Sequence, residues 1–262
     1  MRMKITDTHA HYTDHAFDND RDELLTRILI ESAEKIITIG CSVSESEEAV
    51  LLAEKYDNLY AAVGIHPENV MDLPDDYLVK IEALTRNGKV VAIGEIGLDY
   101  HYDGYDREKQ IKVFREQLAL AQKLNLPVVI HSRDAAKDTM DILRETIAEK
   151  PLKAQLHCFS GSVETARELV SWGFMVSFTC SLTYKNSKKA HTVCENIPIE
   201  NIMLETDCPY MAPAELRGKR CDSGMLIYSA EKLAQIKKIE TEKAIEICNK
   251  NAEAFFGFNN SL

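Results

Sequence analysis

Short runs of apolar and β-branched residues alternate along the chain with longer segments whose apolar residues recur at helical spacing. The segment from Leu24 to Leu29 is one such amphipathic helix. Ser44, three residues before Glu47, predicts the capping box that opens the second helix, and Asn125-Leu126-Pro127 predicts a helix end. The short runs predict eight strands: Ile5–Tyr12, Lys35–Cys41, Tyr60–Pro67, Val90–Tyr100, Leu126–Arg133, Lys153–Ser160, Phe174–Cys180 and Ile202–Pro209.

The alternation of strands and helices predicts an α/β fold made of parallel βαβ units. Eight such strands are the number that closes a (β/α)8 TIM barrel. An open doubly wound sheet is the alternative, but no G-x-G-x-x-G sequence follows the first strand. We find no repeat or low-complexity linker, so we expect a single domain over residues 1–262, closed by two extra C-terminal helices after Tyr228.

Length and composition fit this prediction, since a TIM barrel needs about 250 residues and the chain has 262. The net charge of −11 argues against bulk attraction to nucleic acid but allows a local basic track. The seven cysteines contain no C-x-x-C pair, which favours free thiols over disulfides or a zinc knuckle. Polar residues follow the basic start Met1–Lys4, and no apolar run approaches a membrane span of about 20 residues. We therefore expect a cytoplasmic protein without membrane association.

Residue types that bind metals lie at the carboxyl ends of the predicted strands, and in a barrel these ends converge on one face. His9 and His11 are two residues apart on one strand, so their side chains point to the same face. A single histidine at a strand end usually has a structural role, but structural histidines have no reason to collect at one end of four strands. The six candidates are His9, His11, Glu95, His131, His157 and Asp207, and His66 ends the third strand.

Four imidazoles and two carboxylates exceed the needs of one four-coordinate ion with an open position. They suit two adjacent divalent cations, for which Mg²⁺, Mn²⁺ and Zn²⁺ are all candidates. Glu95 is the expected bridge, with Gly94 and Gly97 leaving room beside it. Asp207 is expected to touch a metal and to accept a proton from the attacking water. Glu205, two residues earlier, is a second candidate catalytic carboxylate, although a residue in that place more often braces a site.

Seven motifs in this order resemble the TatD family of metal-dependent deoxyribonucleases, from Thr6 to about Phe256. The resemblance implies a (β/α)8 barrel with a two-metal centre that hydrolyses DNA phosphodiester bonds, often as a 3′-5′ exonuclease. It also implies that the six candidates are the ligands and that His66 handles the substrate phosphate. The chain departs from the family pattern at Tyr12-Thr13 and at Cys221–Gly224. The matching stretches are Asp7–His11, Gly64–Pro67, Gly94–Tyr100, His131–Ala135, His157–Gly161, Glu205–Tyr210 with Ala212-Pro213, and Arg217–Arg220.

Basic residues near the same strand ends are candidates for binding DNA, most simply single strands or 3′ ends. One cluster follows the seventh predicted strand and another the eighth, so a closed barrel places them side by side on the metal-bearing face. A lysine-rich loop is as often a plain solvated surface. Cys158 and Cys208 flank two ligands but are expected to be small buried fillers. The basic candidates are Arg133, Lys185, Lys188, Lys189, Arg217, Lys219 and Arg220.

Two alternatives remain. A metal-dependent amidohydrolase or lactonase on the same barrel would act on small carbonyl substrates. Some of these enzymes bridge their metals with a modified lysine, whereas here Glu95 takes that place and no lysine ends a ligand-bearing strand. A non-catalytic scaffold that retains the barrel is the other alternative, and the presence of all six ligands argues against it.

Overall fold

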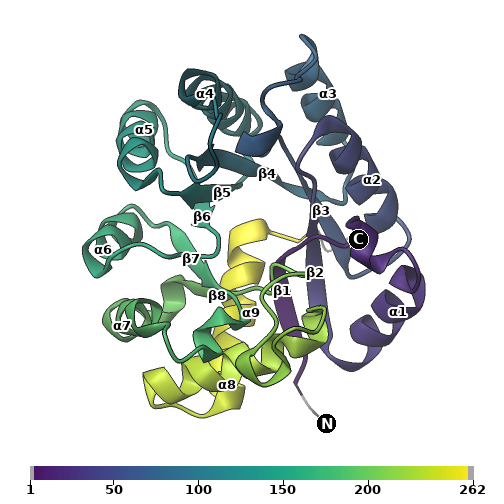
Figure 1. Ribbon diagram of the computed structural model, residues 1–262, viewed down its shortest axis with the longest axis vertical. Coiled ribbons are helices and arrows are strands. Elements are labelled where there is room, and N and C mark those ends of the chain that lie inside the picture. The colour runs from purple at the N-terminus through teal and green to yellow at the C-terminus, as the bar shows by residue number, and fades with distance from the viewer. Residues whose placement is uncertain (1–2, 259–262) are drawn as a thin grey trace.

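Eight strands, β1 to β8, form one parallel sheet in chain order (Figure 1). This computed structural model describes residues 3–258, so Met1, Arg2 and the last four residues of the predicted domain lie outside the described range. The result confirms the predicted (β/α)8 TIM barrel. The strands are β1 Ile5–Ala10, β2 Ala33–Ile39, β3 Leu59–Val63, β4 Val90–Asp99, β5 Val128–Arg133, β6 Ala154–Leu156, β7 Met175–Phe178 and β8 Ile202–Leu204.

An α-helix follows each strand around the outside of the ring, and within residues 3–258 one further helix at the C-terminus extends the barrel, where two were predicted (Figure 1). The α-helices are α1 Arg21–Glu31, α2 Val43–Ala53, α3 Tyr77–Leu84, α4 Arg107–Leu124, α5 Ala136–Glu149, α6 Val163–Ser171, α7 Lys188–Asn196, α8 Leu226–Lys237 and α9 Thr241–Phe256. Short 3-10 helices are η1 His15–Phe17, η2 Pro67–Asn69, η3 Cys180–Thr183, η4 Ile199–Asn201, η5 Ala214–Leu216 and η6 Ser223–Met225. Within residues 3–258, none of these helices combines the length and apolar content needed to span a membrane.

The barrel closes where the end of β1 meets the segment after β8. The amide of Asp207 donates to the carbonyl of His9 at 2.9 Å, and the amide of His11 donates to the carbonyl of Cys208 at 2.8 Å. Nearer the other end of the seam, the side chains of Asn249 and Asn251 in α9 form hydrogen bonds to the backbone of β1 and β8. The Asn249 side chain accepts from the amide of Thr6 at 2.9 Å, and Asn251 donates to a β8 carbonyl at 2.7 Å. The direct backbone hydrogen bonds that close the barrel therefore lie at the predicted metal ligands His9, His11 and Asp207.

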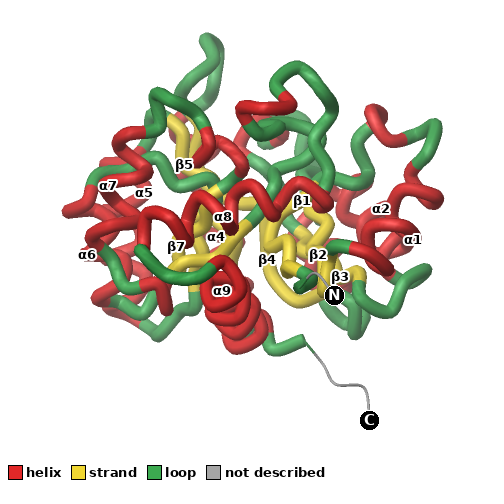
Figure 2. Tube along the Cα trace, turned by 90° about the horizontal axis from the view of Figure 1, so that it is seen from below, coloured by secondary structure: helices red, strands yellow, loops and turns green. Residues whose placement is uncertain are grey.

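Helix α9 also supplies apolar side chains to one end of the barrel. Phe255 and Phe256 are buried in a cluster with Ile37 and Ile39 of β2 and with Met203 of β8. A separate, larger cluster packs the surrounding helices onto the strands. Figure 2 shows α9 beneath one end of the strands, opposite the long loops at the other end. The chain thus seals one end with apolar residues and leaves the carboxyl ends of the strands for polar ones.

Several predicted strands are longer than the observed ones. β6 ends at Leu156 and β8 at Leu204, so His157 and Asp207 lie in the segments that follow. The predicted cap of the second helix is also wrong by two residues, because the Ser42 hydroxyl accepts from the amide of Glu45 at 3.2 Å. The predicted stop at Asn125 is confirmed by its left-handed conformation, at φ 55°.

Candidate metal centre

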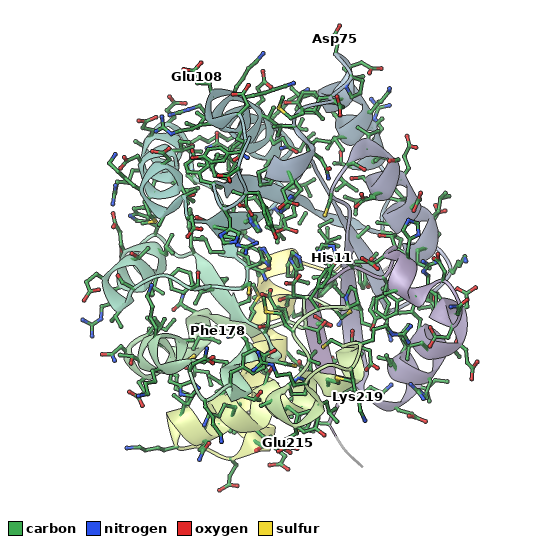
Figure 3. All side chains as sticks on the ribbon, viewed as in Figure 1. His11, Asp75, Glu108, Phe178, Glu215 and Lys219 are labelled. Atoms are coloured by element: carbon green, nitrogen blue, oxygen red, sulfur yellow. The ribbon has the colours of Figure 1, made fainter. Side chains whose placement is uncertain are left out.

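The side chains of the six predicted ligands gather at the carboxyl ends of the strands, with His11 near the middle of the ring (Figure 3). Glu95 of β4 lies at the centre of the group. Its Oε2 atom is 3.3 Å from Nε2 of His9 and 3.8 Å from Nε2 of His11. Its Oε1 atom is 2.8 Å from Nδ1 of His131 and 2.6 Å from Nε2 of His157. The two carboxylate oxygens therefore face two different sets of imidazoles.

Asp207 completes the set on the Oε2 side. Its Oδ1 atom is 3.3 Å from Nε2 of His11 and 3.6 Å from Nε2 of His9. The backbone bonds that close the barrel fix these three residues relative to one another. His66 lies on the other side, with its Nε2 atom 3.6 Å from Oε1 of Glu95. The structure thus brings together all seven residues that the strand-end pattern singled out.

These donor atoms have the spacing and chemistry of a metal site. Donors that bind one tetrahedral ion at about 2.0–2.2 Å lie roughly 3.4 Å from one another. The distance from His9 to Glu95 and the distance from His11 to Asp207 are both 3.3 Å, close to this value. Two ring nitrogens also face each other at 3.1 Å in each set, His9 against His11 and His131 against His157. Two neutral ring nitrogens at this distance need a shared proton or a cation between them. The cluster therefore fits divalent metal ions.

The protonation states of the central groups suit metal binding. Burial alone would raise the pKa of Glu95, but His157 and His9 outweigh burial and hold that pKa well below its ordinary value. Burial and the charge of His157 lower the pKa of His9 to about 4. Ionised carboxylates and neutral imidazoles are the forms that bind cations. The other three imidazoles differ. Hydrogen bonds to Asp99 and Glu95 outweigh burial and raise the pKa of His131 to about 9, and neighbouring groups also raise the pKa values of His11 and His157, so a cation has to displace a proton from these rings.

Buried carboxylates behind the ligands hold the imidazoles in place. Oδ2 of Asp99 is 2.8 Å from Nε2 of His131, the nitrogen that faces away from Glu95. Glu205 has no exposed side-chain surface, and its Oε1 atom lies 3.7 Å from Nδ1 of His157. A hydrogen-bonded partner such as Asp99 fixes the orientation of a ligating histidine, whereas Nδ1 of His157 has no hydrogen-bond partner among the described residues. Asp99 was not predicted, although its position four residues after Glu95 on the same strand places both on one face.

The environment of Glu205 bears on its predicted catalytic role. Its carboxylate accepts hydrogen bonds from Ser177, from the Gln155 side chain at 3.1 Å and from the amide of Cys158. Burial raises its pKa to about 7. A carboxylate enclosed on all these sides has no exposed surface to meet a substrate, and it holds the backbone beside His157 through the amide of Cys158.

Gly97 serves a different purpose from the one predicted. Its φ is +145°, and a Cβ atom there would lie 2.0 Å from the carbonyl oxygen of His131. At Gly94 a Cβ atom would lie 2.7 Å from Cβ of Val129. The two glycines therefore let β5 approach β4 closely, and they do not keep space open beside the ligands.

The predicted basic residues other than Arg220 are exposed. Arg133 and Arg217 are exposed cations that lie over tyrosine rings, 5.1 Å from the Tyr102 centroid and 5.5 Å from the Tyr184 centroid. Lys219 is exposed in the loop after β8 (Figure 3). Lys185, Lys188 and Lys189 are also exposed.

Arg220 is engaged elsewhere, and the structure corrects its predicted role. Its guanidinium forms a two-pronged pair with Asp20 at 2.8 and 2.6 Å. It also donates to the carbonyl of Ala16 and lies 4.6 Å from the ring centroid of Phe17. These contacts use the planar fork that phosphate binding would need. Arg220 therefore ties the loop after β8 to the segment before α1.

A cavity of about 400 Å³ adjoins the metal centre between the starts of α5 and α6. His157 and Lys189 both border it, and Met140, Leu156 and Phe159 give it an apolar wall. A ligand-sized hollow therefore connects one metal-binding imidazole with one of the predicted basic residues.

All seven cysteines are free, as predicted. Among the described residues, Cys158 and Cys208 belong to none of the groups that could hold a metal, whereas Cys41 does, with His11 and Glu95. Sequence reasoning missed Cys41. The available signal was its position two residues after the end of β2, at the same end of the barrel as the ligands.

Comparison with known proteins agrees with this site. Residues 6–257 match the family described as TatD related DNase. A Bacillus subtilis protein named uncharacterized metal-dependent hydrolase YabD is 41% identical over 255 residues, covering 97% of this chain and 100% of that protein. A Cronobacter sakazakii protein named 3′-5′ ssDNA/RNA exonuclease TatD is 34% identical over 207 residues, 78% of each chain. The crystal structure of YjjV, a TatD homologue from Escherichia coli, matches with a TM-score of 0.90 at 29% identity, covering 97% of this chain and 98% of that one. The chain belongs to the TatD family of metal-dependent hydrolases.

Proposed function

We propose that this hydrolase cleaves phosphodiester bonds of DNA from the 3′ end. The observation that carries the proposal is Glu95, whose two oxygens face two separate sets of imidazoles. Paired divalent ions are typical of enzymes that cleave phosphodiesters. The exonuclease name of the Cronobacter relative supports a nucleic-acid substrate.

The donor sets divide into two half-sites for two divalent cations, Mg²⁺, Mn²⁺ or Zn²⁺. His9, His11 and Asp207 face one oxygen of Glu95, and His131 and His157 face the other. Bound divalent ions supply a Lewis acid for the phosphate and lower the pKa of water. Glu95, ionised and buried, is the bridge between the half-sites.

Asp207 is the proposed proton acceptor for the attacking water. Its side chain is 14% exposed, whereas that of Glu95 is 3% exposed, so Asp207 is the more accessible carboxylate of its half-site. Its pKa lies below the ordinary value because its hydrogen bond to His11 and the neighbouring imidazoles outweigh burial. An ionised carboxylate within reach of the site can accept a proton.

His66 is placed to donate a hydrogen bond to the substrate phosphate. Its Nδ1 atom accepts from the amide of Glu68 at 3.2 Å. Burial lowers the pKa of His66 to about 3, so the ring is neutral and carries its proton on Nε2. That nitrogen faces the metal centre, which makes it a donor to a phosphate oxygen there.

The polynucleotide is proposed to bind across exposed cations around the centre, namely Arg133, Lys189, Arg217 and Lys219. Because Arg133 and Arg217 lie over tyrosine rings, each site combines a cation with an aromatic face. Such pairs bind phosphates and bases of single strands. The cavity beside His157 and Lys189 is a candidate for a base or sugar near the scissile bond.

The decisive experiment is metal-reconstituted digestion of 5′- and 3′-labelled oligonucleotides, single- and double-stranded, as DNA and as RNA. We expect stepwise shortening of single-stranded DNA from its 3′ end. Asp207→Asn should fold and retain part of its metal but lose at least about 100-fold in kcat, because the proton acceptor is gone. Near wild-type turnover by this variant would remove Asp207 from the role. Hydrolysis of a lactone panel with no cleavage of bis-p-nitrophenyl phosphate or oligonucleotides would favour the lactonase alternative instead.

A further inference from the structure

The two places where the chain departs from the TatD sequence pattern meet in the structure. Tyr12 lies two residues after the end of β1, and Ser223 begins the 3-10 helix η6. Their hydroxyl oxygens are 2.8 Å apart, and the Tyr12 hydroxyl also accepts from the amide of Ser223 at 3.0 Å. Both residues are buried. The departures therefore form one specific contact between segments that lie 211 residues apart in the sequence.

This contact continues through Asp7 to the segment that carries Asp207. The Ser223 hydroxyl donates to Oδ2 of Asp7 at 2.6 Å, and the Thr206 hydroxyl donates to the same oxygen at 2.6 Å. The amide of Thr206 donates to Oδ1 of Asp7 at 2.9 Å. Asp7 and Thr206 are both buried. One buried carboxylate thus holds the side chain and the backbone of the residue directly before Asp207.

The backbone at Asp207 has a conformation that needs such support. Its φ is +57°, in the left-handed region that residues other than glycine seldom adopt. The amides on both sides are fixed, that of Thr206 by Asp7 and that of Cys208 by the Thr206 hydroxyl oxygen at 3.3 Å. Uncommon backbone conformations persist where surrounding contacts hold them in place. The hydrogen bonds from Asp7 therefore stabilise the turn that directs the Asp207 side chain at the metal centre.

We propose that Tyr12 and Ser223 are positioning residues for Asp207 and act through Asp7 and Thr206. A serine hydroxyl has a single proton, and because Ser223 donates it to Asp7, its bond to Tyr12 is one in which Tyr12 donates. Tyr12 thereby keeps the Ser223 proton directed at Asp7. Hydrogen-bonded partners behind a metal ligand keep its geometry. The proposal rests on the place of Asp207 in the proposed function and not on the substrate.

The first test is a double-mutant cycle on Mn²⁺ affinity, measured by calorimetric titration of the metal-free full-length protein. Y12F removes only the Tyr12 hydroxyl and should weaken Mn²⁺ binding by about tenfold. In protein that already carries D207N, Y12F should cost less than about twofold, because the ligand that it positions is gone. S223A should give the same pattern, and it leaves the Tyr12 hydroxyl bonded to the amide at position 223, so the cycle does not depend on the folding of Y12F. Equal losses in the two backgrounds would overturn the proposal.

The matched control is Y77F, which removes the hydroxyl of another buried tyrosine, one that donates to Glu116 of α4 at 2.5 Å. It should leave Mn²⁺ affinity and turnover unchanged. In hydrolysis of bis-p-nitrophenyl phosphate at saturating Mn²⁺, Y12F should lower kcat about tenfold and leave KM within about twofold, because Asp207 acts on the attacking water. Wild-type affinity and kcat in folded Y12F and S223A, or a change confined to KM, would overturn the proposal. Coupled Mn²⁺ affinities without oligonucleotide cleavage would overturn the proposed function alone.

Discussion

At the scale of single residues, Glu95 is the proposed bridge of the candidate metal centre, because its two carboxylate oxygens face different imidazoles. Glu95→Gln replaces one oxygen with an amide nitrogen that cannot bind a cation, so one half-site loses its anionic donor. We expect loss of at least one ion by metal analysis and a fall in metal-dependent hydrolysis of more than about 100-fold.

Glu205→Gln is the matched control for this prediction, because it makes the same substitution at a buried carboxylate that lies 3.7 Å from His157, behind the predicted ligands. Removing a partner behind a ligand costs about 10–100-fold in metal affinity or activity. The control should therefore retain both ions at high metal concentration. Equal losses in the two variants would mean that Glu95 does not bridge the half-sites.

Sequence pattern predicted the ligands but not their supports. The ligands are recognisable because metal-binding residue types recur at strand ends, and a barrel brings strand ends together. Asp99 ends β4 and Cys41 follows β2, so both lie at strand ends as the candidates do, but the sequence does not show that each contacts one histidine of another strand. Arg220 was predicted to bind phosphate from its place after the eighth strand, and the sequence could not reveal its pair with Asp20, which lies 200 residues away.

At the scale of elements, the junction of β4 and β5 fixes two ligands at once. Cα pairing sets Gly97 opposite His131, two residues after Glu95 on β4. Gly97→Ala would place Cβ 2.0 Å from the His131 carbonyl oxygen, at a φ of +145° that side chains rarely adopt. The two strands would have to separate, which displaces His131 from Glu95.

We expect Gly97→Ala to lower stability by several kcal/mol, about 2–4, as an unrelieved backbone clash does. Metal affinity should fall with it. Gly88→Ala is the matched control, because a Cβ atom there meets nothing within 4 Å. Urea unfolding and metal titration of both variants check the prediction, and wild-type metal affinity in Gly97→Ala would show that the close approach of β4 and β5 does not position the ligands.

The strands were predictable in number and order but not in length. Buried apolar residues continue past several strand ends; Phe159, for example, is 7% exposed yet lies outside β6. A burial pattern alone therefore extends the predicted strand over Lys153–Ser160, while the observed pairing covers Ala154–Leu156. Beyond Leu156 the backbone departs from strand geometry at Cys158, whose φ is +44°, although the amides of His157 and Phe159 still donate to the carbonyls of Ile130 and Ser177.

At the scale of the whole molecule, α9 closes the barrel end opposite the metal centre. Phe256 is 6% exposed and packs with strand residues that come from different parts of the chain. Phe256→Ala should lower the free energy of unfolding by about 3–5 kcal/mol, the usual cost of removing a buried phenyl ring. Leu51→Ala, at a 62% exposed position of α2, is the control and should change it by less than about 0.5 kcal/mol. Chemical denaturation of the two variants decides whether α9 stabilises the barrel or only covers it.

The distribution of charge over the molecule decides how a chain of net charge −11 holds a polyanion. Arg217 and Lys219 are exposed near the carboxyl ends of the strands, whereas Arg220 is held by Asp20. Contacts to phosphates away from the scissile bond hold substrate and transition state about equally, so R217A with K219A should raise KM more than it lowers kcat. Each lost contact should also flatten the slope of log K against log salt by about 0.7–0.9.

The measurement is cleavage of a single-stranded oligonucleotide from low to moderate salt, beside hydrolysis of bis-p-nitrophenyl phosphate. R217A with K219A should impair the oligonucleotide and leave the small ester nearly unchanged, because the ester reaches only the metal centre. K243A with K250A removes the same charge from α9, at the other end of the barrel, and should leave both substrates unaffected. If the α9 variant lost oligonucleotide activity equally, the attraction would come from net charge and not from a track beside the metals. If R217A with K219A impaired both substrates alike, these two residues would support the metal centre itself. The small ester contacts only that centre, so only a defect there can slow its hydrolysis.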